Sequence, residues 1–261
     1  MKTRSTPQYF ISDTLLAISG YFRAISFIRQ HQLWKGLLRH GWANRLLMFV
    51  GLLVGLQFLY LFWQWLTHLD LNNSTALSLQ MGLFLADFAQ STYSFLFLGG
   101  FKYIILILMD AAMEHFSESA NMILHNQPLS NKISHYIASK WRMVKIVVHN
   151  FFKEILATIS ITIILSLLDF DFLEGTMIFL AQCYYLGFAV IDTYNSQHKM
   201  TIKQSALYTQ QFAGVAVGIG IVFHFLLLIP LAGPLLAPCL GSVSATLTMH
   251  QLEALPMTSE S

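Results

Sequence analysis

The feature that most constrains this chain is a long uncharged run interrupted by prolines. No Asp, Glu, Lys or Arg occurs from Phe212 to Leu252. Three prolines spaced by four lie just past the middle of the run: Pro230, Pro234 and Pro238. The run is twice the ~20 residues that one helix needs to cross a bilayer, and a proline inside a helix removes a hydrogen bond and kinks or breaks it. We therefore expect a broken helical hairpin over residues 212–247, with the three prolines as its hinge.

The composition of the whole chain points to a membrane protein. Hydrophobic side chains make up 55% of the 261 residues and charged side chains 11%, which is too apolar for a soluble domain and too poor in charge for a disordered chain. We expect a single all-α integral membrane domain over 1–261, with the lipid bilayer as a partner. The basic residues are scattered among loops rather than gathered in a stripe, so nucleic acid is not an expected partner.

The sequence carries no motif that indicates an enzyme. It contains no GxSxG, HExxH or P-loop. Its two cysteines, Cys183 and Cys239, lie in apolar surroundings, and its ten histidines lack the spacing of metal ligands. We therefore predict no enzyme activity, no metal site and no other cofactor.

Apolar runs predict four membrane helices ahead of the proline-broken run: 46–66, 81–109, 147–168 and 177–191. The first two are long enough for a full crossing, whereas the purely apolar part of the third, 155–168, is only 14 residues long and the fourth run is also short. No Gly or Pro occurs between Leu129 and Glu174, so the third helix can begin near Ser130, well before its apolar part. The expected fold thus has two long helices that project into the cytoplasm, short helices that partly penetrate the membrane, and the C-terminal hairpin.

Lys and Arg residues alternate between the segments that join these helices. Seven of the fifteen precede the first span, none occurs in 67–80, five occur in 110–153 and none occurs in 169–176. Two more, Lys199 and Lys203, follow the fourth span. Because cytoplasmic loops carry the excess of basic residues, this pattern predicts cytoplasmic N- and C-termini.

Residues 8–40 combine apolar positions at near-helical spacing with scattered basic residues. The pattern is typical of an amphipathic helix that lies in the membrane interface, with Trp34 at headgroup level. Lys35 follows directly, and Arg39 and Arg45 lie nearby in the sequence. Two interpretations of Lys35 stay open. It supplies positive potential to an anion beside the first span, or it extends to the phosphate headgroups of the bilayer.

Several segments share the signature of one membrane protein family. Its polar block matches Asp192, His198, Lys199 and Lys203, and its signature in the last helices matches Ile229-Pro230, Pro238 and Ala245-Thr246. Upstream, the matching positions are Gly20, the stretch 33–37 and Asn44. In these segments the chain resembles the CysZ family of bacterial sulfate permeases, which belongs to a broader family that includes the eukaryotic etoposide-induced proteins.

The resemblance implies a permease or channel for a small inorganic anion, sulfate first, which feeds sulfur assimilation from the bacterial inner membrane. It also implies that the substrate binds at the early basic motif, where we name Lys35, Trp34, Arg39 and Arg45. That motif departs from the family, because Trp34-Lys35 stands where two adjacent basic residues are usual. The alternative function is a non-transporting membrane scaffold or remodelling protein of the same family.

Two further features leave alternatives open. Asp192, His198 and Lys199 form either a hydrogen-bonded gate or a salt-bridged loop that fastens the fourth span. The pairs Gly51-x-x-x-Gly55 and Gly214-x-x-x-Gly218 allow close contact between helices. They permit a homo-oligomer without requiring one.

Overall fold

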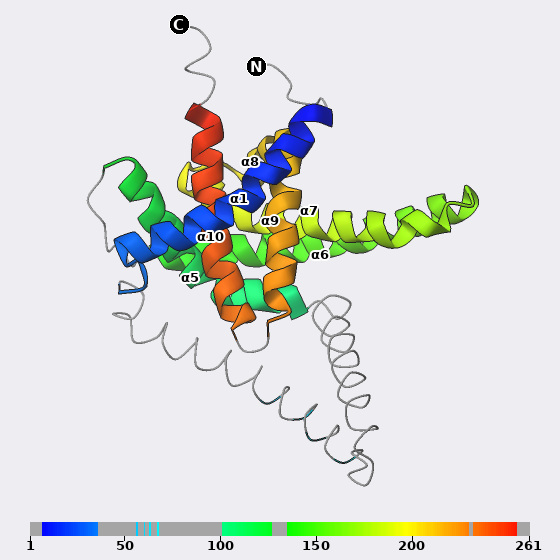
Figure 1. Cartoon of the computed structure of the whole chain (residues 1–261), viewed down its shortest axis with the longest axis horizontal. Coiled ribbons are helices and arrows are strands. Elements are labelled where there is room, and N and C mark those ends of the chain that lie inside the picture. The colour runs from blue at the N-terminus through cyan, green and yellow to red at the C-terminus, as the bar shows by residue number, and fades with distance from the viewer. Residues whose placement is uncertain are drawn as a thin grey trace, which may run out of the picture.

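The computed structural model describes residues 7–35, 101–126, 135–229 and 232–254, together with four single positions between 56 and 67. Every regular element among these residues is a helix (Figure 1), which confirms the all-α prediction for this part of the chain. The helices are α1 (Pro7–His31), α5 (Phe101–Leu124), α6 (His135–Leu167), α7 (Asp171–Gln197), α8 (Ile202–Gln211), α9 (Ala213–Leu227) and α10 (Gly233–Ala254). Several predictions lie outside the described residues: most of 46–66, the first part of 81–109, Arg39, Arg45, Pro230 and the pair Gly51 and Gly55.

Three of the described helices are long and apolar enough to cross a membrane. They comprise Tyr9–His31 in α1, Trp141–Leu167 in α6 and Phe172–Gln197 in α7. The bent pair α8 and α9 also passes this test when it is taken as one broken span, with 93° between the two helices. These lengths fit the membrane protein that the composition predicts.

Two of these helices differ from their sequence predictions. α7 has 27 residues, which at 1.5 Å per residue makes it about 40 Å long rather than a short, partly penetrating helix. The apolar run 177–191 is shorter than α7 because the polar residues that follow it, Asp192 and Asn195, do not end the helix. They are buried inside the bundle instead. α1 was predicted to lie in the interface, but its length and hydropathy also satisfy those of a span.

α9 lies between α1 and α7, and glycines allow the close approach on both sides. A Cβ atom on Gly218 would lie 2.6 Å from the carbonyl oxygen of Thr14 in α1. A Cβ on Gly220 would lie 1.9 Å from the carbonyl oxygen of Cys183 in α7. Gly214 likewise faces the backbone of Phe10. The pair Gly214 and Gly218 therefore packs against α1 of the same chain, which is the close helix contact that its spacing permits.

α9 and α10 pack side by side and are joined at one end (Figure 1), where the prolines cluster in the sequence. Of the three prolines predicted as a hinge, Pro230 lies outside the described residues. Pro238 lies inside α10, and Pro234 is its second residue, where helices leave the N–H unpaired in any case. Because both occur within the first two turns of α10, the helix continues to Ala254. α9 ends at Leu227 and α10 begins at Gly233.

α6 and α7 together form an arm that extends beyond the other helices (Figure 1). α6 has 33 residues and is about 50 Å long, in line with the long third helix that was predicted. The two helices meet at a turn where Asp169 has a φ of 56°. Large apolar side chains such as Phe152, Leu156 and Phe172 are exposed along the arm, a surface suited to lipid.

Candidate functional site

A lysine and a glutamate form an ion pair inside the helix bundle, and we call it the inner pair. Nζ of Lys102 in α5 lies 2.6 Å from Oε1 of Glu154 in α6. The hydroxyl of Tyr103 donates to Oε2 of the same carboxylate at 2.5 Å. Lys102 is fully buried and Glu154 is 6% exposed. Each oxygen of the carboxylate therefore has its own donor.

The surroundings of Lys102 explain why this pair must form. Ile105, Leu106 and Met109 follow it along α5 and are all fully buried. A single charge placed among such apolar side chains costs several kcal/mol unless it is neutralised. Glu154 supplies the opposite charge from the neighbouring helix, so the pair as a whole is neutral.

α7 and α9 place the thiol of Cys183 and the imidazole of His224 within electrostatic range of Lys102. Nδ1 of His224 donates to the carbonyl oxygen of Gly220 at 2.9 Å, and Sγ of Cys183 lies 3.7 Å from the same nitrogen. Gln182 is 5% exposed, and its Oε1 has no hydrogen-bond partner among the described residues. Polar groups from four helices thus meet at one level of the bundle.

A second ion pair joins the first part of α6 to the last part of α7, and we call it the outer pair. Arg142 holds Asp192 with two hydrogen bonds, Nε to Oδ2 at 2.8 Å and Nη2 to Oδ1 at 2.7 Å. The hydroxyl of Ser205 in α8 also donates to Oδ1, at 2.5 Å. Arg142 further donates from Nη1 to the carbonyl of Met200, which lies in the turn before α8. The outer pair therefore fastens α8 to the bundle.

The two pairs are separated along the helices. Arg142 and Glu154 are twelve residues apart on α6, which corresponds to about 18 Å along the helix. A cavity of about 10 Å³, the size of one water molecule, lies against the outer pair and is also lined by Asp110 and Glu114 of α5. The bundle therefore has two charged levels, separated by about 18 Å along α6.

The predicted cluster of Asp192, His198 and Lys199 is not assembled. Asp192 is bound by Arg142 and Ser205. Nδ1 of His198 instead lies 3.1 Å from the carbonyl oxygen of Tyr194, one turn earlier in α7. Lys199 is exposed and has a φ of 57° in the turn that ends this helix. Of the two interpretations left open, the structure resembles the fastened loop, with Arg142 as the partner that the sequence did not reveal.

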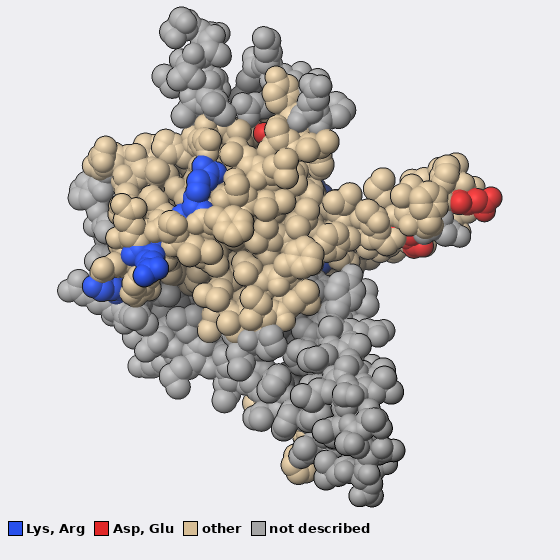
Figure 2. Space-filling view, viewed as in Figure 1, with Lys and Arg blue, Asp and Glu red and all other residues tan. Residues whose placement is uncertain are grey.

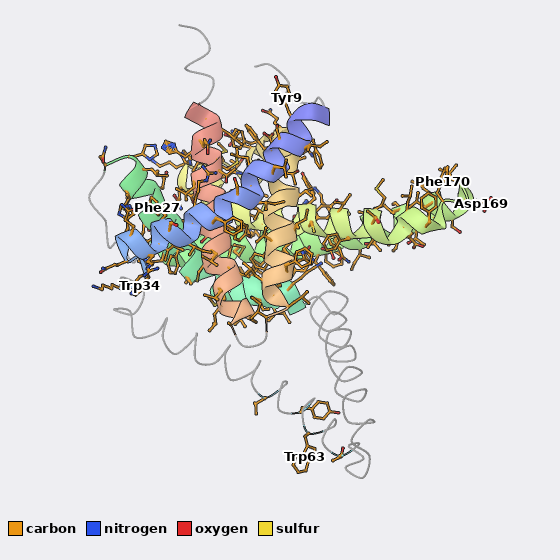
Figure 3. The ribbon with its side chains drawn as sticks, in the orientation of Figure 1. Tyr9, Phe27, Trp34, Trp63, Asp169 and Phe170 are labelled. Atoms are coloured by element: carbon orange, nitrogen blue, oxygen red, sulfur yellow. The ribbon has the colours of Figure 1, made fainter. Side chains whose placement is uncertain are left out.

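The predicted substrate residues Trp34 and Lys35 lie directly after α1 (Figure 3). The backbone N–H of Lys35 donates to the carbonyl of Gln32 at 3.0 Å, and the intervening Leu33 is buried. The carbonyl oxygen of Leu33 lies 3.3 Å from Nε2 of His115 in α5, and this contact anchors the turn. Both Trp34 and Lys35 are exposed, and Lys35 makes no ion pair within the described part of the chain.

Three comparisons with known proteins complete the description of the site. The chain matches no family model, no curated protein sequence and no solved structure.

Proposed function

We propose that the protein is a membrane permease or channel for a small inorganic anion, with sulfate as the first substrate to test, and that it feeds sulfur assimilation. The burial of Lys102 carries this proposal. Ionisable side chains within a membrane bundle are costly and most often mark the path of an ion or substrate. In the resting protein, pairing the lysine with a glutamate makes the group neutral overall and so offsets the free-energy cost of burying its charge.

The inner pair offers a simple way to pass an anion. An anion that reaches Lys102 replaces Glu154 as the partner of the ammonium group, and the carboxylate moves away by repulsion. When the anion leaves, Glu154 returns and the site is neutral again. The hydroxyl of Tyr103 can donate to an anion as it donates to the carboxylate. The outer pair repeats the same combination of charges further along α6 and α7.

The exposed end of α1 is the place where we expect the anion to be attracted first. Lys35 is exposed beside Trp34 and has no acidic partner among the described residues. The resemblance to the sulfate permeases favours this motif as a binding site, together with Arg39 and Arg45. An unpaired lysine raises the local concentration of anions through its field.

The arrangement that we propose places the protein in a bacterial inner membrane with both termini in the cytoplasm. The alternation of Lys and Arg between the loops supports this orientation. In it, α1 lies along the cytoplasmic interface, α6 and α7 cross the membrane, and α9 and α10 enter and return to the same face.

Uptake of radiolabelled sulfate into proteoliposomes tests the proposal. We expect the purified protein to raise sulfate uptake above that of protein-free vesicles, and Lys35→Ala to reduce it several-fold. Lys145→Ala is the matched control, because Lys145 is an exposed lysine of α6 outside both ion pairs. Folded protein that gives no uptake would favour the non-transporting scaffold instead.

A further inference from the structure

An open groove of about 720 Å³ lies between α1, α5 and α10. Its apolar walls include Phe22 and Phe27 of α1 and Leu247 of α10. Phe27 is labelled on α1 in Figure 3. The groove continues outward over Phe22, which is 72% exposed. A ligand that fills it must therefore present a substantial apolar surface.

Among the described residues, the polar lining of the groove carries positive charge and no carboxylate. Its basic residue is Arg23, accompanied by His250, Gln30 and Gln251. Arg23 donates to the side-chain oxygen of Gln251 and forms no ion pair within the described residues. Figure 2 shows basic side chains over α1 on a face that is otherwise mostly uncharged. The guanidinium group thus remains uncompensated at the edge of an apolar groove.

The acidic residue of α10 near this region is already engaged elsewhere. Glu253 accepts hydrogen bonds from the hydroxyls of Tyr194 at 2.8 Å and Tyr208 at 2.7 Å. His250 instead stacks on His125 at the end of α5, with 5.1 Å between the ring centroids. In the described part of the chain, no carboxylate that lines the groove competes with a ligand for Arg23.

We propose that this groove binds an anionic phospholipid, with its phosphate on Arg23 and an acyl chain along Phe22 and Phe27. Guanidinium groups bind phosphate through two parallel hydrogen bonds, which the exposed side chain of Arg23 is free to reorient and form. A soluble anion would leave the apolar walls without contact, and a neutral lipid would leave Arg23 without a counter-charge. An anionic lipid satisfies both parts of the groove.

The position of the groove fits a lipid that holds two helices together. α1 and α10 approach closely at Gly20, where an added Cβ would lie 2.6 Å from Oγ1 of Thr248 and 2.7 Å from Oγ of Ser244. The groove begins on the same helix one turn further on, at Phe22 and Arg23. A lipid bound there would contact both helices and extend this small interface.

Thermal unfolding of the detergent-solubilised protein, titrated with phosphatidylglycerol, measures this binding. We expect saturable stabilisation by phosphatidylglycerol and much less by phosphatidylcholine, which lacks net charge. Arg23→Gln should weaken the apparent affinity about fivefold, the effect of one basic residue on anionic lipid, and Arg23→Lys should restore most of it. Arg29→Gln is the matched control, because Arg29 is an exposed residue of the same helix that does not line the groove.

Three results would overturn the proposal. Equal losses in Arg23→Gln and Arg29→Gln would show attraction to the whole basic helix rather than to the groove. Equal stabilisation by phosphatidylcholine would show that the headgroup is not recognised. Saturation by inorganic phosphate alone would show a site for soluble anions. None of these readouts depends on sulfate uptake, so failure here leaves the proposed function to its own test.

Discussion

Nζ of Lys102 lies 2.6 Å from Oε1 of Glu154, and the two residues are brought together from positions 52 apart in the sequence. Both side chains are almost completely buried within the protein. The pair joins α5 to α6 at the level where α7 and α9 contribute Cys183 and His224. The charge balance of this level therefore depends on both partners.

Removing one partner of the inner pair should destabilise the protein strongly. In Lys102→Met the carboxylate of Glu154 stays buried without its counter-ion, and such changes typically cost about 3–5 kcal/mol. The double variant Lys102→Met/Glu154→Met should recover most of that loss, because it leaves no unpaired charge. Unfolding in detergent measures both single variants, Lys102→Met and Glu154→Met, and the double variant. Additive losses in the double variant would contradict the ion pair.

Breaking the outer pair should release α8. Asp192→Asn removes the charge that holds Arg142 and weakens the bond from Ser205. We expect trypsin to cleave several-fold faster after Lys199 or Lys203, both of which are exposed. His198→Gln is the control, since its ring contacts its own helix. Equal cleavage in the two variants would show that His198 belongs to the same cluster after all.

Adding a methyl group at the contact of α9 with α1 should be costly. Gly218→Ala places a Cβ 2.6 Å from the backbone oxygen of Thr14, and crowding of this kind typically costs about 1–3 kcal/mol. Gly175→Ala is the matched control, because nothing lies within 4 Å of that position in α7. It should stabilise by about 0.5–1 kcal/mol through the better helix propensity of alanine. Thermal unfolding distinguishes the two, and similar shifts would contradict the packing of α9.

The stacked imidazoles of His125 and His250 should make stability fall at acidic pH. Burial lowers the pKa of His250, and the neighbouring His125 and His198 lower it further, whereas Glu253 opposes the shift. Because the folded protein binds this proton less readily than the unfolded chain, stability is complete above a pH of about 6.5 and is lost as the pH falls toward the lower folded pKa. Melting temperatures between pH 7.5 and 5 should fall less in His250→Gln than in the wild type. Identical pH profiles would contradict this effect.

The helices were easier to predict than the charged contacts between them. The absence of Gly and Pro before Glu174 predicted the long α6. Helix periodicity does not tell which charged residues meet, because Lys102, Arg142, Glu154 and Asp192 lie on different helices. Lys102 stands alone within an apolar run, and nothing in that run indicates its partner. A lone glutamate at the start of the apolar part of α6 was the available signal for its partner.

The glycine pair of α9 shows the same limit of sequence patterns. Gly214 and Gly218 correctly indicated a close helix contact, but the spacing does not say which helix approaches. The structure assigns that contact to α1 of the same chain. Similarly, proline spacing did not reveal that Pro238 is tolerated near the start of α10, where the helix axis is already set by packing against α1, α5 and α9.

Sulfate uptake by the inner-pair double variant tests the central claim most directly. Lys102→Met/Glu154→Met removes both charges and should remain folded, so its uptake separates a role in transport from a role in stability. We predict that proteoliposomes containing the wild type take up radiolabelled sulfate. We predict that the folded double variant takes it up at least tenfold more slowly. Uptake by the double variant at the wild-type rate would contradict an anion path through Lys102.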